Sequence, residues 1–114
     1  QDSKSRLPVV IYGAGSSGRQ LALSLQHGVE FQPIAFVDDK LELQQMSVSG
    51  MRVYPRSQLV ELVGKHNVTK VLLAIPSASA QQRKKIISEF DALSVELLTI
   101  PGTADLVSGK LHRE

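Results

Sequence analysis

Residues 9–21 read VVIYGAGSSGRQL, and this stretch decides the fold. It begins with an apolar run rich in β-branched residues, which is typical of a strand covered on both faces. Glycines follow, and Leu21, Ala22 and Leu25 then recur on one side of a helix. The stretch therefore predicts a buried strand, a glycine turn and an amphipathic helix in immediate succession.

The same alternation of strand and helix patterns continues along the chain. Helical segments of about ten residues separate short apolar runs, and this alternation predicts right-handed crossovers and a parallel sheet. We expect an α/β fold, a doubly wound, mainly parallel five-stranded Rossmann-like sheet with helices on both faces. The expected strands are 7–12, 33–37, 51–54, 69–76 and 94–101.

Three residues indicate where the helices begin or end. Ser57 is expected to cap the helix that follows it. Ser79 with Gln82 three residues later matches a capping box. Gly28 lies where the first helix is expected to stop.

The composition excludes several classes of function. The chain of 114 residues has no cysteine, so thiolate catalysis and cysteine-ligated zinc are excluded. Its 13 basic and 11 acidic residues are spread along the sequence, and we expect no nucleic-acid partner. The basic run 83–85 is expected to be a solvated helix face. No apolar stretch approaches the roughly 18 residues of a membrane span.

We divide the chain into three parts. Residues 1–6 are polar and are expected to be a linker, and residues 7–101 form the Rossmann-like nucleotide-binding domain. Residues 102–114 are expected to connect it to a catalytic domain that this chain lacks. We expect the chain to be a fragment of a longer protein, truncated at both ends.

The glycine loop matches a dinucleotide-binding fingerprint. Gly13, Gly15 and Gly18 have GxGxxG spacing between a strand and a helix, with an acid twenty residues beyond the last glycine. Gly13 would permit the tight turn, Gly15 would let a pyrophosphate approach the backbone, and Gly18 would let the helix pack closely. The helix N-terminus would then face the phosphates. The alternative is a tight turn that binds nothing.

Other residues of the expected site follow the ends of strands. Asp38 would accept the ribose hydroxyls and repel a 2′-phosphate, which favours NAD over NADP. Asp39 is the second choice for this role, and an acidic turn is the alternative for the pair. Ser16 and Ser17 could donate to phosphate oxygens or cap the helix. The full set of expected cofactor-binding residues is Gly13, Ala14, Gly15, Ser16, Ser17, Gly18, Asp38, Asp39, Ile75 and Pro76.

The sequence shows no set of catalytic residues. His27, His66 and His112 fall at helix ends or near the C-terminus, and neither tyrosine is followed by a lysine four positions later. No cluster of His, Asp or Glu has metal-ligand spacing. The chain is therefore expected to bind a ligand without transforming it.

Five segments carry a resemblance to a known family, and it covers nearly the whole chain. The chain resembles the first cytoplasmic Rossmann-like domain of membrane-bound nucleotide-sugar epimerase/dehydratases of bacterial polysaccharide biosynthesis, which are UDP-N-acetylhexosamine 4,6-dehydratase-like. The segments are IYGAGSSGRQLALSL (11–25), IAFVDDKLELQ (34–44), GMRVYP (50–55), VLLAIPSAS (71–79) and LLTIPGTADLVSGKLHRE (97–114).

The resemblance implies a larger parent protein. Membrane helices would precede this domain, and a second NAD-binding domain with the catalytic residues would follow it. Gly13, Gly15, Gly18 and Asp38 match the family's first glycine loop and acid. The parent would act on the cytoplasmic side of the bacterial inner membrane. Its partners would be a nucleotide or nucleotide-sugar, the catalytic domain of the same chain and a possible second copy.

Two other functions stay open from the sequence. A similar domain precedes the transferase part of polyprenyl-phosphate sugar-1-phosphate transferases. Alternatively, the domain could serve only for docking or dimerisation, with its glycine loop empty.

Overall fold

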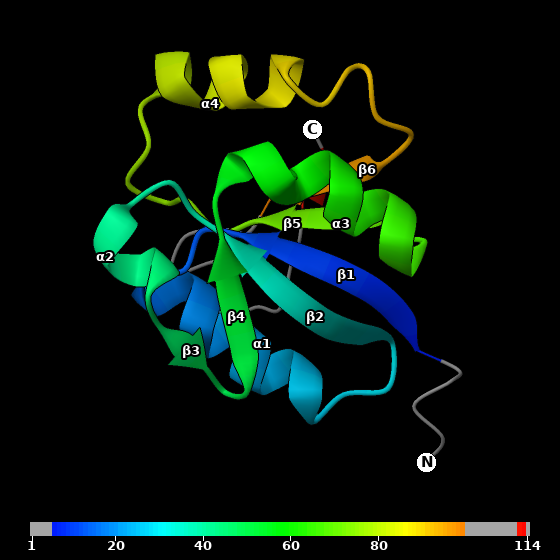
Figure 1. The fold of residues 1–114 in the computed structure, drawn as a ribbon. Coiled ribbons are helices and arrows are strands. Elements are labelled where there is room, and N and C mark those ends of the chain that lie inside the picture. Colours follow the sequence, from blue (N-terminus) through cyan, green and yellow to red (C-terminus); the bar gives the residue numbers. More distant parts are fainter. Residues whose placement is uncertain (1–5, 100–111, 114) are drawn as a thin grey trace.

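The computed structural model describes residues 6–99, 112 and 113, and these build one mixed β-sheet with helices on both faces (Figure 1). The sheet has seven strands in the order β3-β4-β2-β1-β5-β6-β7. The strands are β1 (Leu7–Tyr12), β2 (Phe31–Val37), β3 (Ser47–Val48), β4 (Met51–Tyr54), β5 (Lys70–Leu73), β6 (Glu96–Thr99) and β7 (His112–Arg113).

The predicted doubly wound sheet is confirmed. Strands β4, β2, β1, β5 and β6 are parallel to one another and correspond to the five expected strands. The sequence interpretation missed β3 and β7, which pair antiparallel at the two edges. Strand β7 falls within the segment 102–114 that we expected to be a connection, and the rest of that segment lies outside the described residues.

The helices lie on opposite faces of the sheet. Helix α1 (Ser16–Gln26) packs on one face through Ala22, whereas α3 (Leu59–His66) packs on the other through Leu59 and Leu62. Figure 1 shows α1 on one side of the strands and α3 and α4 (Ala80–Ser88) on the other. A short helix α2 (Leu41–Gln44) and the 3-10 turn η2 (Arg56–Gln58) complete the described helices.

The core is aliphatic and centres on β1 and β5. Val9, Val10 and Ile11 are fully buried, and their side chains alternate between the two faces. This two-sided burial explains why the strand has no polar residue. On the α3 side the Tyr12 ring meets Phe90 edge-on, with ring centroids 5.9 Å apart.

Strand β2 begins earlier than expected. It starts at Phe31 and includes Pro33, which has no N–H to donate to the neighbouring strand. The pairing with β1 shifts just after this residue, because Val9 faces Pro33 and Val10 faces Ala35. The irregularity lets a proline lie inside the sheet.

The expected helix ends had mixed outcomes. Ser79 caps α4 in a complete capping box with Gln82, as predicted. The prediction for Ser57 was wrong: Ser57 lies inside η2, and α3 begins after Gln58 with no side-chain cap. Helix α1 ends at Gln26, with His27 as its C-cap, so it stops close to Gly28 as expected; Gly28 does not adopt the left-handed conformation of a glycine cap.

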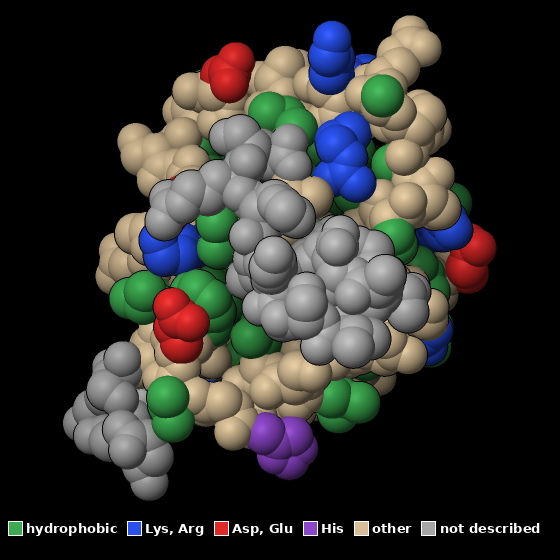
Figure 2. Space-filling model, turned by 180° about the vertical axis from the view of Figure 1, so that it is seen from behind, with side chains coloured by type: hydrophobic (Ala, Val, Ile, Leu, Met, Phe, Trp, Pro, Cys, Tyr) green, Lys and Arg blue, Asp and Glu red, His purple; other side chains and the backbone are tan. Residues whose placement is uncertain are grey.

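The described surface carries mixed charge. Seen from behind (Figure 2), Lys and Arg side chains are scattered among acidic and hydrophobic ones on the part of this face that the described residues form. None of the helices in the described residues has the length and apolar character needed to cross a membrane.

Candidate functional site

The turn between β1 and α1 depends on two glycines. Gly13 has φ +114°, and a Cβ there would overlap the carbonyl oxygen of Ala74 at the end of β5. A Cβ at Gly18 would overlap the carbonyl oxygen of Gly13. Gly18 therefore lets α1 approach the backbone of the glycine loop, whereas the distance of 3.5 Å from its added Cβ to Ile11 would be an ordinary contact.

Gly15 is different because it faces open space. It is the N-cap residue of α1, with φ −75°, and no described atom lies within 4 Å of the Cβ it lacks. The first turn of α1 contains no acid, and no side-chain hydrogen bond caps it among the described residues. The helix start therefore presents its N–H groups and the positive end of its dipole to the space above Gly15.

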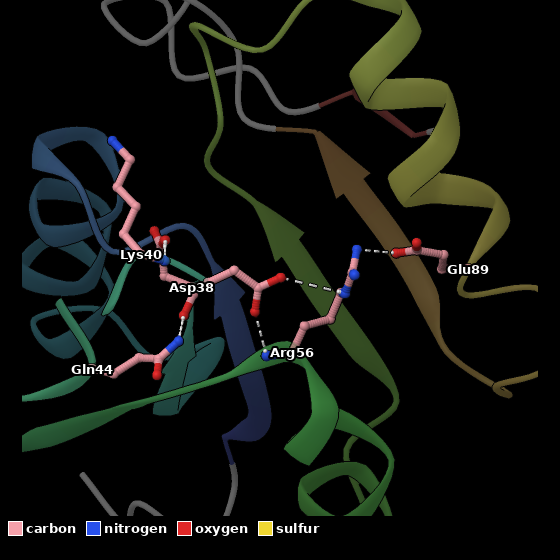
Figure 3. Close-up of polar contacts among 6 residues, drawn as sticks. Asp38, Lys40, Gln44, Arg56 and Glu89 are labelled. Atoms are coloured by element: carbon pink, nitrogen blue, oxygen red, sulfur yellow. Dashed lines mark hydrogen bonds and ion pairs between the residues drawn. The ribbon is translucent and has the colours of Figure 1, made fainter. Parts of the chain in front are cut away.

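Asp38 is hydrogen-bonded to the glycine loop and to the segment that follows β2. Its Oδ2 accepts a hydrogen bond from the backbone N–H of Ala14 at 2.9 Å, and its Oδ1 accepts one from the N–H of Lys40 at 3.0 Å. Gln44 of α2 adds a hydrogen bond to the Asp38 carbonyl oxygen (Figure 3). A carboxylate has about four lone-pair positions, so each Asp38 oxygen can still accept a hydrogen bond from a hydroxyl group of a ligand.

Asp39 has a separate role beside Arg56. Its Oδ1 accepts from the Arg56 backbone N–H at 2.9 Å, and its Oδ2 lies 3.5 Å from Nε of the same residue. The other end of the Arg56 guanidinium donates to Glu89 at the end of α4, with 2.7 Å between Nη1 and Oε1 (Figure 3). Arg56 thus joins the end of β2 to α4.

Tyr12 lies next to this ion-pair network at the end of β1. Burial raises the pKa of its hydroxyl above the ordinary value, and the positive charge of Arg56 partly opposes that shift. The hydroxyl is therefore a neutral hydrogen-bonding group at physiological pH.

A cleft of about 720 Å³ joins these parts at the carboxyl edge of the parallel strands. All of the expected binding residues line it except Ala14 and Gly18, which are buried behind the loop. Ala14 contributes its N–H to Asp38 from that position. The residues that line the cleft from the expected set are Gly13, Gly15, Ser16, Ser17, Asp38, Asp39, Ile75 and Pro76.

Sequence reasoning missed one wall of the cleft. Gln82, Lys85 and Ile86 of α4 line it, together with Tyr12 and Arg56. The spacing of the three α4 residues is that of one helix face, which is a signal that the sequence contained. The missed lining residues are Tyr12, Lys40, Arg56, Ala74, Ala78, Gln82, Lys85 and Ile86.

The expectation that residues 83–85 form a solvated face is confirmed for Lys84 and Lys85, which are exposed, and is wrong for Arg83. Arg83 is partly buried, and its Nη2 lies 3.5 Å from the carbonyl oxygen of Ile75. Both lysines are exposed, but only Lys85 lines the cleft. Arg83 differs because its side chain reaches back to a backbone carbonyl just beyond the end of β5.

A second groove of about 420 Å³ lies between the end of α4 and β6. It is lined mainly by apolar side chains, among them Ile87, Phe90 and Leu97, and shares no residue with the cleft. The described residues contain no group of His, Asp or Glu arranged to hold a metal ion.

The parallel sheet, the glycine turn and the cleft at its carboxyl edge define a Rossmann-like domain. A family model described as the PglD N-terminal domain matches residues 8–90, and the chain belongs to this family.

Two relatives are similar over nearly the whole chain. A crystal structure of UDP-D-quinovosamine 4-dehydrogenase from Vibrio fischeri is 45% identical, with a TM-score of 0.88, and the match covers 96% of this chain and 93% of that one. Capsular polysaccharide biosynthesis protein CapD from Staphylococcus aureus is 30% identical over 108 residues. That match covers 90% of this chain but only 18% of CapD, so this chain spans about a fifth of its curated relative.

A more distant likeness concerns the fold alone. The Rex-family repressor RSP, in a crystal structure with β-NADH, is 16% identical, with a TM-score of 0.66. The match covers 93% of this chain and 59% of the repressor.

Proposed function

We propose that this chain is a nucleotide-binding Rossmann domain that holds the diphosphate of NAD(H) or of a nucleotide-sugar at the start of α1. The observation that carries this proposal is the open, uncapped helix start at Gly15 within a cleft of about 720 Å³. Backbone N–H groups and the helix dipole favour an anion there, and the absence of a side chain at Gly15 leaves room for it.

The relatives support both kinds of ligand. The similar Vibrio fischeri protein is described as acting on a UDP-sugar by dehydrogenation, and the repressor of similar fold was crystallised with β-NADH. A nucleotide-sugar and a dinucleotide share a nucleoside diphosphate, so the same loop suits either one. Within the dinucleotides we favour NAD, because the Asp38 carboxylate would repel a 2′-phosphate.

The larger protein is also part of the proposal. We infer a membrane-anchored, NAD-dependent nucleotide-sugar dehydratase or epimerase, with UDP-N-acetylhexosamine 4,6-dehydratase as the specific activity. It would serve bacterial surface polysaccharide synthesis on the cytoplasmic side of the inner membrane. This domain would bind the nucleotide, and a catalytic domain of the same chain would perform the reaction. Similarity to CapD supports a role in polysaccharide synthesis, since that protein is named for capsular polysaccharide biosynthesis.

Calorimetric titration of the purified 114-residue chain tests the ligand. We expect NADH or UDP-N-acetylglucosamine to bind, and NADPH to bind more weakly than NADH. If none of them bound at millimolar concentration, the nucleotide proposal would be wrong and the docking function would be favoured.

A further inference from the structure

One face of α4 forms a wall of the cleft although it is largely polar. Gln82, Lys85 and Ile86 line the cleft, and Glu89 just beyond the helix reaches Arg56. These four residues have i, i+3, i+4 and i+7 spacing, so they lie along a single stripe. Of the four only Ile86 is partly buried, whereas Gln82, Lys85 and Glu89 are exposed, so the stripe borders an open cleft rather than the core.

Packing on the core and an ion pair hold α4 beside the cleft. No side chain within α4 is fully buried. Ile86 and Ile87 are partly buried against the core, and the Glu89–Arg56 ion pair fixes the region just beyond the helix end. Because Lys85 is four residues before Glu89, the contact with Arg56 turns the Lys85 side of the helix towards the glycine loop.

The charges of the cleft leave Lys85 without a counter-ion. The Asp38 carboxylate accepts from two backbone N–H groups, and Asp39 and Glu89 both pair with Arg56. Lys85 has no ion pair within the described part of the chain. Lys40, the other lysine of the cleft, extends away from Arg56 and Glu89 in Figure 3.

We propose that Lys85 pairs with the diphosphate of the bound ligand from the α4 side. The diphosphate then lies between the start of α1 and the ammonium group of Lys85, and α4 contributes directly to affinity for nucleoside diphosphates. This inference rests on the proposed function and adds a binding residue to it. We expect loss of this charge-assisted contact to weaken binding about ten-fold.

Neighbouring lysines of one helix provide a matched test. NADH and UDP-N-acetylglucosamine are titrated calorimetrically into the wild-type chain, Lys85→Ala, Lys85→Gln and Lys84→Ala. We expect both Lys85 variants to raise the Kd of the bound probe about ten-fold, because each removes the charge. Lys84→Ala should leave the Kd unchanged, and a further variant titrated in the same way, Lys85→Arg, should keep most of the wild-type affinity because it keeps the charge.

Salt dependence separates a charge contact from a structural effect. The difference in Kd between wild type and Lys85→Gln should shrink as ionic strength rises from about 0.01 M to about 1 M, because salt screens the pairing. Equal Kd values for the Lys85 and Lys84 variants would overturn the role of Lys85 and leave the nucleotide site standing. Failure of the wild type to bind either probe would instead overturn the proposed function, and this inference with it.

Discussion

At the scale of single residues, a substitution at Gly15 is predicted to weaken ligand binding without destabilising the fold. A side chain at this position has room, since no described atom lies within 4 Å of its Cβ and φ is −75°. We expect Gly15→Val to keep the melting temperature while raising the Kd for NADH or UDP-N-acetylglucosamine about ten-fold or more, because the branched side chain occupies the space of the diphosphate. Calorimetry and thermal unfolding followed by circular dichroism measure the two quantities.

Gly18→Ala is the contrasting control. Its Cβ would overlap the backbone of Gly13, so this variant should lose stability as well as binding. If Gly15→Val bound the ligand as tightly as wild type, the diphosphate would not lie over the start of α1.

Asp38 is predicted to matter for stability before any ligand binds. Asp38→Ala leaves the buried N–H of Ala14 without its acceptor, and the N–H of Lys40 loses its partner too. We expect the free energy of unfolding to fall by about 1–3 kcal/mol in urea titrations. Asp91→Ala is a control, because its exposed carboxylate has no ion pair among the described residues. Equal stability of the two variants would contradict a stabilising role for the hydrogen bonds of Asp38.

At the scale of elements, two serines test what a helix cap contributes. Ser79 accepts from the N–H of Gln82 in the capping box, whereas Ser57 lies in η2 and caps nothing. Ser79→Ala should speed amide hydrogen exchange in α4, with a loss of about 1 kcal/mol in local stability. Ser57→Ala should leave exchange in α3 unchanged. Hydrogen exchange read by mass spectrometry measures both, and equal effects would show that the cap of α4 contributes little.

The same elements show what could be predicted from the sequence. The central strands and α1 were predictable because burial on both faces leaves an uninterrupted apolar run, and the glycines of the turn are demanded by backbone contacts. The capping box was predictable because it involves residues three apart. Each of these signals is local.

The missed features depend on contacts between distant segments. Strand β3 has two residues and pairs with β4 at the edge of the described sheet, and β7 pairs with β6 although the two strands are far apart in sequence. The α4 wall of the cleft is placed by core packing of Ile86 and Ile87 and by the contact of Glu89 with Arg56, which is 33 residues away. Spacing placed Lys85 on a face of the helix, but only the tertiary contact determines that this face meets the cleft.

At the scale of the whole molecule, the cleft exists only when the sheet is assembled. Its lining begins at Tyr12 and ends at Ile86, and it collects the ends of β1, β2 and β5 at one edge together with α1 and α4. The unfolded chain cannot reproduce this arrangement, so a ligand that binds the cleft should stabilise the entire domain.

Ligand-linked stability measures this coupling. With NADH or UDP-N-acetylglucosamine at about 100 times its Kd, the free energy of unfolding should rise by about 2.7 kcal/mol. For a domain of this size that corresponds to a rise of about 10 °C in the melting temperature. Gly15→Val at the same ligand concentration should show a much smaller rise, because its folded state has lost the diphosphate position. An equal rise in both proteins would mean that the ligand stabilises the fold from somewhere other than the glycine loop.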